Sequence, residues 1–215
     1  VVSTYNEPLI TAEWTTAIFE RARSAGLATG IVSNGHGTPQ VVERLAPWLT
    51  LCKIDLKSCR EARYRELGGR LGPVLETIRE VQARGIWLEV VTLLVPGFND
   101  DEAELGQIAA FLASVSVDIP WHVTAFHGEY RMWAMADTTP TQLERAVAVG
   151  RASGLRFVYA GNRPGRVGGL EDTHCPHCQT RLVGRRGYHI LEHTIGSDGR
   201  CPRCGLAVPG RWGHL

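Results

Sequence analysis

Apolar positions along the chain fall into two patterns, short near-continuous runs and longer stretches with helical spacing. The short runs are rich in valine, isoleucine and leucine, as in 88–95, and strands covered on both faces have this composition. They predict strands near 1–5, 28–33, 51–56, 87–94, 121–126 and 155–160. Because helices alternate with these strands, the sequence predicts an α/β fold, either an open doubly wound sheet or a (β/α) barrel.

The helical stretches carry their own start and end signals. Three of them end at a glycine that precedes an apolar run, at Gly26, Gly85 and Gly154, and glycine suits the left-handed conformation that closes a helix. Another begins at 139–142, where threonine, proline and glutamine stand in the order of an N-terminal capping box. Buried faces are predicted at Leu105, Ile108, Ala109 and Leu112 in one helix and at Leu71, Leu75 and Ile78 in another.

Composition separates a C-terminal module from the rest of the chain. The 215 residues are 44% hydrophobic and 21% charged, with a net charge of +1, which is typical of a globular protein and argues against disorder. Residues 173–215 hold six arginines against two acids, together with four of the six cysteines. The segment before them has no periodicity. These features predict a body at 1–162, a linker at 163–172 and a small module at 173–215.

Polar side chains gather where the predicted strands end. In parallel α/β folds the carboxyl ends of the strands meet at one edge, and ligands bind there. Taken singly, the groups have ordinary interpretations: 34–35 and 99–100 suit turns. Asp55 and Lys57 suit an ion pair, and His122 suits a buried histidine. Together they indicate a site for a small polar ligand, with the candidates Tyr5, Asn6, Glu7, Ser33, Asn34, Asp55, Lys57 and His122.

Five short motifs follow one another at these strand ends: Tyr5-Asn6-Glu7-Pro8, Ser33-Asn34-Gly35, Asp55-Leu56-Lys57, the segment 95–100 and Pro120-Trp121-His122. In order and spacing they resemble the motifs of radical SAM enzymes of the glycyl-radical-activase type. The segments 121–127, 130–132 and 158–162, with the C-terminal cysteine pairs, resemble more narrowly the radical SAM member of the AmmeMemoRadiSam system. The resemblance covers essentially the whole chain.

The resemblance implies a partial (β/α) TIM-like barrel that binds S-adenosylmethionine (SAM) and carries a small C-terminal zinc ribbon. Residues 5–7 match the position of the Gly-Gly-Glu motif, which binds the methionine amino group. The positions that line the ribose, carboxylate and adenine are matched by Ser33, Asn34, Asp55, Lys57 and His122. The implied reaction is reductive cleavage of SAM at a [4Fe–4S] cluster, which yields a 5′-deoxyadenosyl radical that acts on an unknown substrate, a protein among the candidates.

The family holds its cluster with a CxxxCxxC loop after the first barrel strand, and that loop would precede Val1. The body contains only Cys52 and Cys59, whereas the cluster needs three cysteines. We expect Cys52 to be a buried strand residue and Cys59 a loop thiol. Either the chain lacks its N-terminal segment or it is a degenerate homologue, and the missing first strand and initiator methionine favour the first. We expect the complete protein to be the enzyme and this chain alone to be inactive.

Two Cys-x-x-Cys knuckles, Cys175 with Cys178 and Cys201 with Cys204, predict a tetrahedral structural zinc site. Structural zinc supplies the stability that a module of this size lacks. A pair of disulfides and an auxiliary iron–sulfur cluster are the alternatives. Four thiolates complete the coordination, so we expect the nearby histidines to be surface residues: His174, His177, His189 and His193.

The remaining inferences concern location and partners. The absence of a membrane-length apolar run and of a signal peptide predicts a cytoplasmic protein. The arginines of the module are expected to form a solvated face against the acidic body rather than a nucleic-acid site. The family context implies Memo-like and AMMECR-like partners and an electron donor. Two functions are alternatives to the radical SAM enzyme described above. One is an activase that installs a glycyl radical, and the other is a non-catalytic protein with a SAM-like pocket and a basic ribbon.

Overall fold

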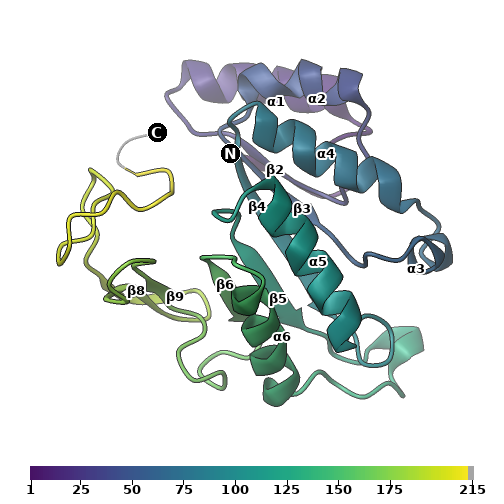
Figure 1. Ribbon diagram of the computed structural model, residues 1–215. Helices are drawn as coiled ribbons and strands as arrows, with labels where there is room; N and C mark the ends of the chain where they lie inside the picture. The colour runs from purple at the N-terminus through teal and green to yellow at the C-terminus, as the bar shows by residue number, and fades with distance from the viewer. Residues whose placement is uncertain (213–215) are drawn as a thin grey trace. The chain divides into compact units, whose positions relative to one another are not determined.

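Six strands of the computed structural model, which describes residues 1–212, form one sheet whose order follows the chain (Figure 1). The pairs β1–β2, β2–β3, β3–β4 and β5–β6 are parallel. The predicted α/β class is therefore confirmed. The strands are β1 (Val2–Ser3), β2 (Gly30–Ser33), β3 (Leu51–Asp55), β4 (Trp87–Leu94), β5 (Trp121–Ala125) and β6 (Val158–Gly161).

Helices connect the successive strands. No helix within residues 1–212 is both long and apolar enough to cross a membrane. The helices are α1 (Ala12–Ser24), α2 (Pro39–Leu45), α3 (Glu61–Glu66), α4 (Leu71–Ala83), α5 (Glu102–Val115) and α6 (Pro140–Ala152), with short 3-10 turns η1 (Ala46–Trp48) and η2 (Tyr130–Met132).

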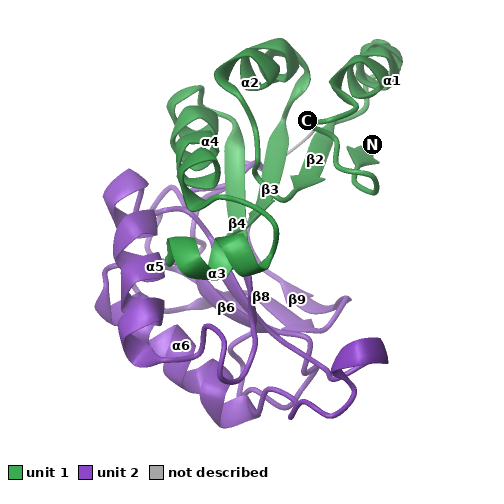
Figure 2. Ribbon diagram, turned by 90° about the vertical axis from the view of Figure 1, so that its right-hand side faces the viewer, with its two compact units in different colours: residues 1–91, 215 green, residues 92–214 purple. Residues whose placement is uncertain are grey.

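The chain divides into two compact units, and the division falls inside β4 (Figure 2). The first unit ends at Val91, and the second begins at Thr92 and includes the C-terminal module. The predicted linker at 163–172 and the predicted boundaries of the body and the module stay predictions. Residues 213–215 of that module lie outside the described residues.

Alternation along β3 decides which side chains of the first unit face the helices. Cys52 and Ile54 are buried, and they line a small cavity together with Val42 of α2 and Val81 of α4. Successive residues of a strand point to opposite faces. Lys53 and its neighbour Asp55 are only partly buried and therefore lie on the face away from these helices.

The second unit has the same alternation around Trp121. The fully buried Trp121 indole donates its Nε1–H to the Thr92 hydroxyl at 2.9 Å. A Cβ atom built on Gly150 of α6 would lie 2.9 Å from the indole, so helix and strand are in close contact here. His122, the next residue on β5, is half-buried on the opposite face.

This contact gives a stability prediction with a matched control. Gly150→Ala is expected to destabilise the protein by about 1–3 kcal/mol, because the new methyl group overpacks against Trp121. Gly106→Ala on α5 is expected to stabilise it by about 0.5–1 kcal/mol, because alanine favours a helix and nothing lies within 4 Å of that Cβ position. Urea unfolding measures both values, and equal effects at the two positions would contradict the prediction.

Most local signals read from the sequence are confirmed. Gly26, Gly85 and Gly154 have φ values of 73°, 70° and 94°. The capping box at 139–142 is formed in full, and Leu105, Ile108, Ala109 and Leu112 are all completely buried. The predicted face of α4 is offset, because Leu71 and Leu75 are only half-buried. Its buried residues are Val74, Thr77, Ile78 and Val81.

The C-terminal module forms a three-stranded antiparallel sheet (Figure 1). Its strands are β7 (Thr173–His174), β8 (Arg181–Arg186) and β9 (His189–His193). Its small core holds Leu182 and Val183 of β8, two of the cysteines and Phe157, which directly precedes β6. The module thus shares its core with the last strand of the second unit's sheet.

Candidate functional site

The Glu7 carboxylate joins the ends of the first two strands. Its Oε1 accepts hydrogen bonds from the Ser33 hydroxyl (2.7 Å) and the Leu9 amide (3.2 Å). Its Oε2 accepts one from the Asn34 amide (2.8 Å). A carboxylate has about four acceptor positions. Three are used, so Oε2 can accept one more donor, and an ammonium group suits a carboxylate of this kind.

The backbone around Glu7 is strained. Asn6 and Glu7 are both left-handed, with φ values of 60° and 52°. Asparagine tolerates this region, but for glutamate it costs about 1–2 kcal/mol. The Glu7 carbonyl oxygen, which accepts the Ile10 amide at 3.0 Å, and the carboxylate contacts hold the turn. Strain held in this way is typical of functional sites. Tyr5, on the same turn, is 91% exposed.

A second set of contacts connects the end of β2 with the loop after β3. Asn34 Oδ1 accepts the His36 amide (2.9 Å), and His36 Nε2 accepts the Arg70 amide (3.0 Å). The His36 ring lies 5.8 Å from the Tyr64 ring, and the Tyr64 hydroxyl accepts the Lys57 amide (3.1 Å). Burial raises the pKa of Tyr64 to about 12, so this hydroxyl stays protonated at neutral pH. Sequence reasoning missed His36 and Tyr64.

Asp55 lies between two lysines at the end of β3. Lys57 Nζ is 3.0 Å from Oδ2, and Lys53 Nζ is 3.4 Å from Oδ1. Oδ1 is buried and has no hydrogen-bond partner among the described residues. A buried carboxylate oxygen normally accepts a hydrogen bond, whereas here the Lys53 ammonium at 3.4 Å balances the charge of Oδ1 without donating one. The ion pair expected from the sequence is therefore present, together with an open acceptor.

The candidates of the sequence analysis are distributed over both units. Glu7, Ser33 and Asn34 are in direct contact, and Asp55 contacts Lys57. Tyr5 and Asn6 are exposed on the turn that holds Glu7. His122 lies in the second unit, where its ring stacks on Tyr159 with centroids 5.0 Å apart and planes at 26°. Residues 99–100 serve a turn, because the Asn99 and Asp100 side chains bind backbone groups of 93–97.

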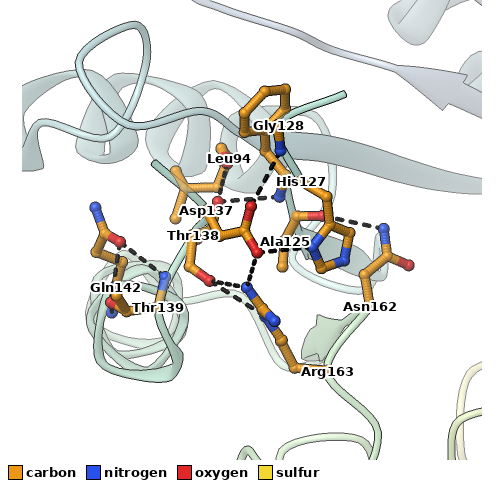
Figure 3. A network of polar contacts seen from close by, with 11 residues as sticks. Leu94, Ala125, His127, Gly128, Asp137, Thr138, Thr139, Gln142, Asn162 and Arg163 are labelled. Atoms are coloured by element: carbon orange, nitrogen blue, oxygen red, sulfur yellow. Dashed lines mark hydrogen bonds and ion pairs between the residues drawn. The ribbon is translucent and has the colours of Figure 1, made fainter. Parts of the chain in front are cut away.

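A polar network fixes the loops after β5 and β6 in the second unit (Figure 3). Asp137 accepts hydrogen bonds from the Gly128 amide (3.0 Å) and Arg163 (3.1 Å), and contacts His127 Nδ1 (3.2 Å). Arg163 also donates to the Thr138 carbonyl oxygen. The loop closed by this network presents exposed aromatic side chains, Tyr130 and Trp133. The network therefore makes this part of the strand-end edge a fixed surface.

Loss of the Asp137 charge is expected to open this loop. Donation by the Gly128 amide, and then by His127 and Arg163, lowers the pKa of Asp137 from 3.8 to about 2. Its contribution is therefore complete above pH 3.8 and is lost as the pH falls through about 2. Asp137→Asn should have the same effect at neutral pH, because an amide has one acceptor oxygen for three donors.

Hydrogen exchange of the Gly128 amide measures the opening as protection relative to the intrinsic rate at the same pH, and we expect lower protection in Asp137→Asn and in the wild type at acid pH. Asp118→Asn is the control, since Asp118 pairs with Arg156 at 3.0 Å outside this network. Unchanged Gly128 exchange in Asp137→Asn would show that the network does not hold the loop.

The four cysteines of the C-terminal module converge on one point. The sulfur atoms of Cys175, Cys178, Cys201 and Cys204 all lie within 4.8 Å of one another. Two sulfur pairs, 175–204 and 178–201, are 3.6 Å apart. Four thiolates at 2.3 Å from one zinc ion in a tetrahedron are about 3.8 Å apart. The structure therefore confirms a four-cysteine site with the dimensions of a single tetrahedral ion.

The pKa values of the cysteines and the closeness of their sulfur atoms favour a bound cation at this site. The Thr180 hydroxyl and amide lower the pKa of Cys178 to about 6, which favours a thiolate there. The Leu206 amide lowers the pKa of Cys204, but desolvation and the neighbouring sulfurs outweigh it and raise that pKa to about 12. All four sulfur atoms at these distances can be thiolates only when a cation lies between them, because metal binding displaces their protons. All four cysteines are free of disulfides.

The other two cysteines behave as the sequence predicted. Cys52 is buried on β3, and burial, followed by the charge of Glu7, raises its pKa to about 12. Cys59 lies in the loop after β3. Of the histidines expected at the surface, His177, His189 and His193 are exposed and His174 is half-buried.

Several curated proteins are similar to this chain in sequence. No protein-family model matches the chain. An uncharacterized protein of Methanocaldococcus jannaschii is 31% identical over 94% of this chain and 59% of its own length. The isethionate sulfite-lyase activating enzyme of Nitratidesulfovibrio vulgaris is 30% identical over 54% of this chain and 40% of its own length. The chain thus spans about half the length of the curated relatives that it matches.

Solved structures define the fold. A domain of pyruvate-formate lyase-activating enzyme from Bacteroides vulgatus superposes with a TM-score of 0.67 at 21% identity, over 75% of this chain and 98% of that domain. A radical SAM methyltransferase from Sphaerobacter thermophilus gives 0.62 at 16% identity, over 73% and 49%. Streptococcus suis SuiB bound to SAM gives 0.59 at 12% identity, over 74% and 39%. The chain therefore has the partial-barrel fold that radical SAM enzymes have.

Proposed function

We propose that this chain is the SAM-binding part of a radical SAM enzyme. The observation that carries the proposal is the Glu7 carboxylate, which is held in a strained turn at the carboxyl end of β1 with one acceptor position open. The strand-end motifs and the shared fold support it.

Each candidate has a role that suits its chemistry. Glu7 binds the ammonium group of SAM, and Ser33 and Asn34 orient its two oxygens. Asp55 Oδ1 accepts a hydrogen bond from a ribose hydroxyl, and Lys57 pairs with the SAM carboxylate. Tyr5 and Asn6 shape the turn, and the assignment of His122 to the adenine rests on the resemblance alone. Bound SAM would supply the 5′-deoxyadenosyl group that abstracts hydrogen, and the electron for its release would come from a [4Fe–4S] cluster that the described residues do not hold.

The described residues do not fit that cluster. Between residues 1 and 212, the one group of cysteines close enough to share a metal is the C-terminal four, and their spacing suits a single ion. Cys52 is buried and its pKa is raised to about 12, and neither Cys52 nor Cys59 belongs to a group of three or more metal-ligand side chains among the described residues. No step through a cluster is assigned to these residues.

Calorimetric titration of the full-length protein with SAM tests the proposal. We expect one saturable binding event per chain. Absence of heat together with unchanged protection of the Asn34 amide at saturating SAM would overturn it.

The four-cysteine site is proposed to hold structural zinc. The sulfur spacing and the thiolate character of Cys178 support this ion. Elemental analysis of the purified protein should find about one zinc ion per chain. Iron in its place would overturn the assignment.

A second candidate function is activation of a glycyl-radical enzyme. It is favoured by the 30% identity with an isethionate sulfite-lyase activating enzyme over about half of this chain. Electron paramagnetic resonance on the full-length protein with SAM, reductant and a glycyl-radical enzyme partner tests this function. A glycyl radical signal on the partner would support it.

The partners are proposed from the family context alone: Memo-like and AMMECR-like proteins and an electron donor. A nucleic-acid role has less support, because two arginines of the module are engaged within it. Arg181 pairs with Glu192 and Asp172, and Arg185 donates to Thr173.

A further inference from the structure

Three planar side chains form a row that runs from β5 of the sheet to the C-terminal module. His122 and Tyr159 are direct partners on the neighbouring strands β5 and β6, and their rings stack with centroids 5.0 Å apart. On β8, the Arg185 guanidinium lies over the Tyr159 ring, with its central carbon 5.9 Å from the ring centre. Tyr159 therefore contacts both the sheet and the module.

The hydroxyl end of Tyr159 is also held by the module. It shares a hydrogen bond of 3.0 Å with the Thr173 hydroxyl on β7. The Arg185 guanidinium donates to the same Thr173 oxygen at 2.6 Å and to the Glu171 carbonyl oxygen at 3.3 Å. A tyrosine ring turns about two side-chain torsions. Contacts at the hydroxyl and at the ring fix both of them.

These module residues depend in turn on the four-cysteine site. Thr173 lies two residues before Cys175, and β7 pairs with β8 at Thr173 and Val183. The small core of the module contains Cys175 and Cys201, and Tyr159 packs against that core. With so few apolar residues in this core, we expect β7 and β8 to need the metal in order to fold. Metal binding is therefore linked to the position of Tyr159.

We propose that the metal-bound module positions His122, with Tyr159 and Thr173 as the positioning residues. The module is a separate three-stranded sheet whose core packs against Phe157 and Tyr159, and the ion keeps the module folded. Without the ion, Tyr159 loses the Thr173 hydroxyl and the Arg185 guanidinium as partners. His122 then loses the fixed ring on which it stacks. The expected effect on SAM affinity rests on the proposed function. The effect of the metal on the position of the His122 side chain does not.

Nuclear magnetic resonance of the histidine ring C–H groups in the full-length protein tests the link. Thr173→Val keeps the shape of the side chain and removes the hydroxyl that binds Tyr159. With metal bound, we expect this variant to shift the His122 signal toward its position in Tyr159→Leu. The His127 signal should stay in place, because that ring contacts Asp137 in a separate network.

A matched control lies in the same module. The Thr194 hydroxyl donates to backbone oxygens of 181 and 182 and is not bound to Tyr159. Thr194→Val should therefore leave the His122 signal unchanged. An unshifted His122 signal in Thr173→Val, or an equal shift in both variants, would overturn the proposal.

Metal removal provides the second readout. A strong chelator should shift the His122 signal as Tyr159→Leu does, and returning zinc should reverse the shift. If the amide signals of β8 and β9 collapse while His122 stays at its original position, the proposal is wrong.

Measuring the SAM affinity of variants distinguishes failure of this inference from failure of the proposed function. Tyr159→Leu should weaken SAM binding about two- to tenfold, the value of one aromatic pair. In the His122→Ala background the same change should have no further effect. If the unmodified protein does not bind SAM, the proposed function fails, and the His122 signals still decide whether the metal positions this side chain.

Discussion

Removing the metal from the four-cysteine site is expected to unfold β7, β8 and β9 and leave most of the sheet intact. Structural zinc contributes about 10–16 kcal/mol of apparent binding free energy in small modules, far more than the few buried side chains of this core can replace. Removal of the ion also breaks the ligand bonds that join the two cysteine knuckles, whose sulfur atoms lie within 4.8 Å of one another. We expect the loss of β8 and β9 amide signals on chelation and their return with zinc.

Two cysteine variants sharpen this experiment. Cys178→Ser removes one ligand and should release the ion at chelator concentrations that the wild type tolerates. Cys59→Ser is the matched control, because Cys59 lies in the loop after β3 and should have no effect on zinc content. Retention of β8 and β9 in protein shown by elemental analysis to be free of metal would contradict the prediction.

Glu7→Gln is expected to reduce the affinity for SAM about 10- to 100-fold. A hydrogen bond to a charged group is worth about 1.5–3 kcal/mol, and each 1.4 kcal/mol is about tenfold in affinity. The amide also replaces an acceptor oxygen by a donor that faces either the Ser33 hydroxyl or the Asn34 amide. Calorimetry on the full-length protein measures the change.

Two further variants separate binding from folding. Glu20→Gln, on the exposed side of α1, removes the same charge and should leave the affinity unchanged. Asp55→Asn should weaken SAM binding without disturbing the turn at Glu7. Unchanged affinity in both Glu7→Gln and Asp55→Asn would refute the assignment of this site, whatever the thermal stability of the variants.

Local sequence patterns are enough to predict most elements of this protein and its four-cysteine site. Helix ends at Gly26 and Gly85, the capping box at 139–142 and the two cysteine knuckles are local patterns. Their chemistry depends on residues a few positions apart, so it can be read without a fold. The α/β class followed because strands and helices alternate along the chain.

Contacts between residues that are distant along the chain could not be predicted from local patterns. Glu7 reaches Ser33, 26 positions along the chain, and His122 stacks on Tyr159 in a neighbouring strand. The offset buried face of α4 and the contact of Arg185 with Tyr159 also depend on how elements pack. Strand register and helix packing set these contacts, and both arise from the burial of apolar surface between elements rather than from any local pattern.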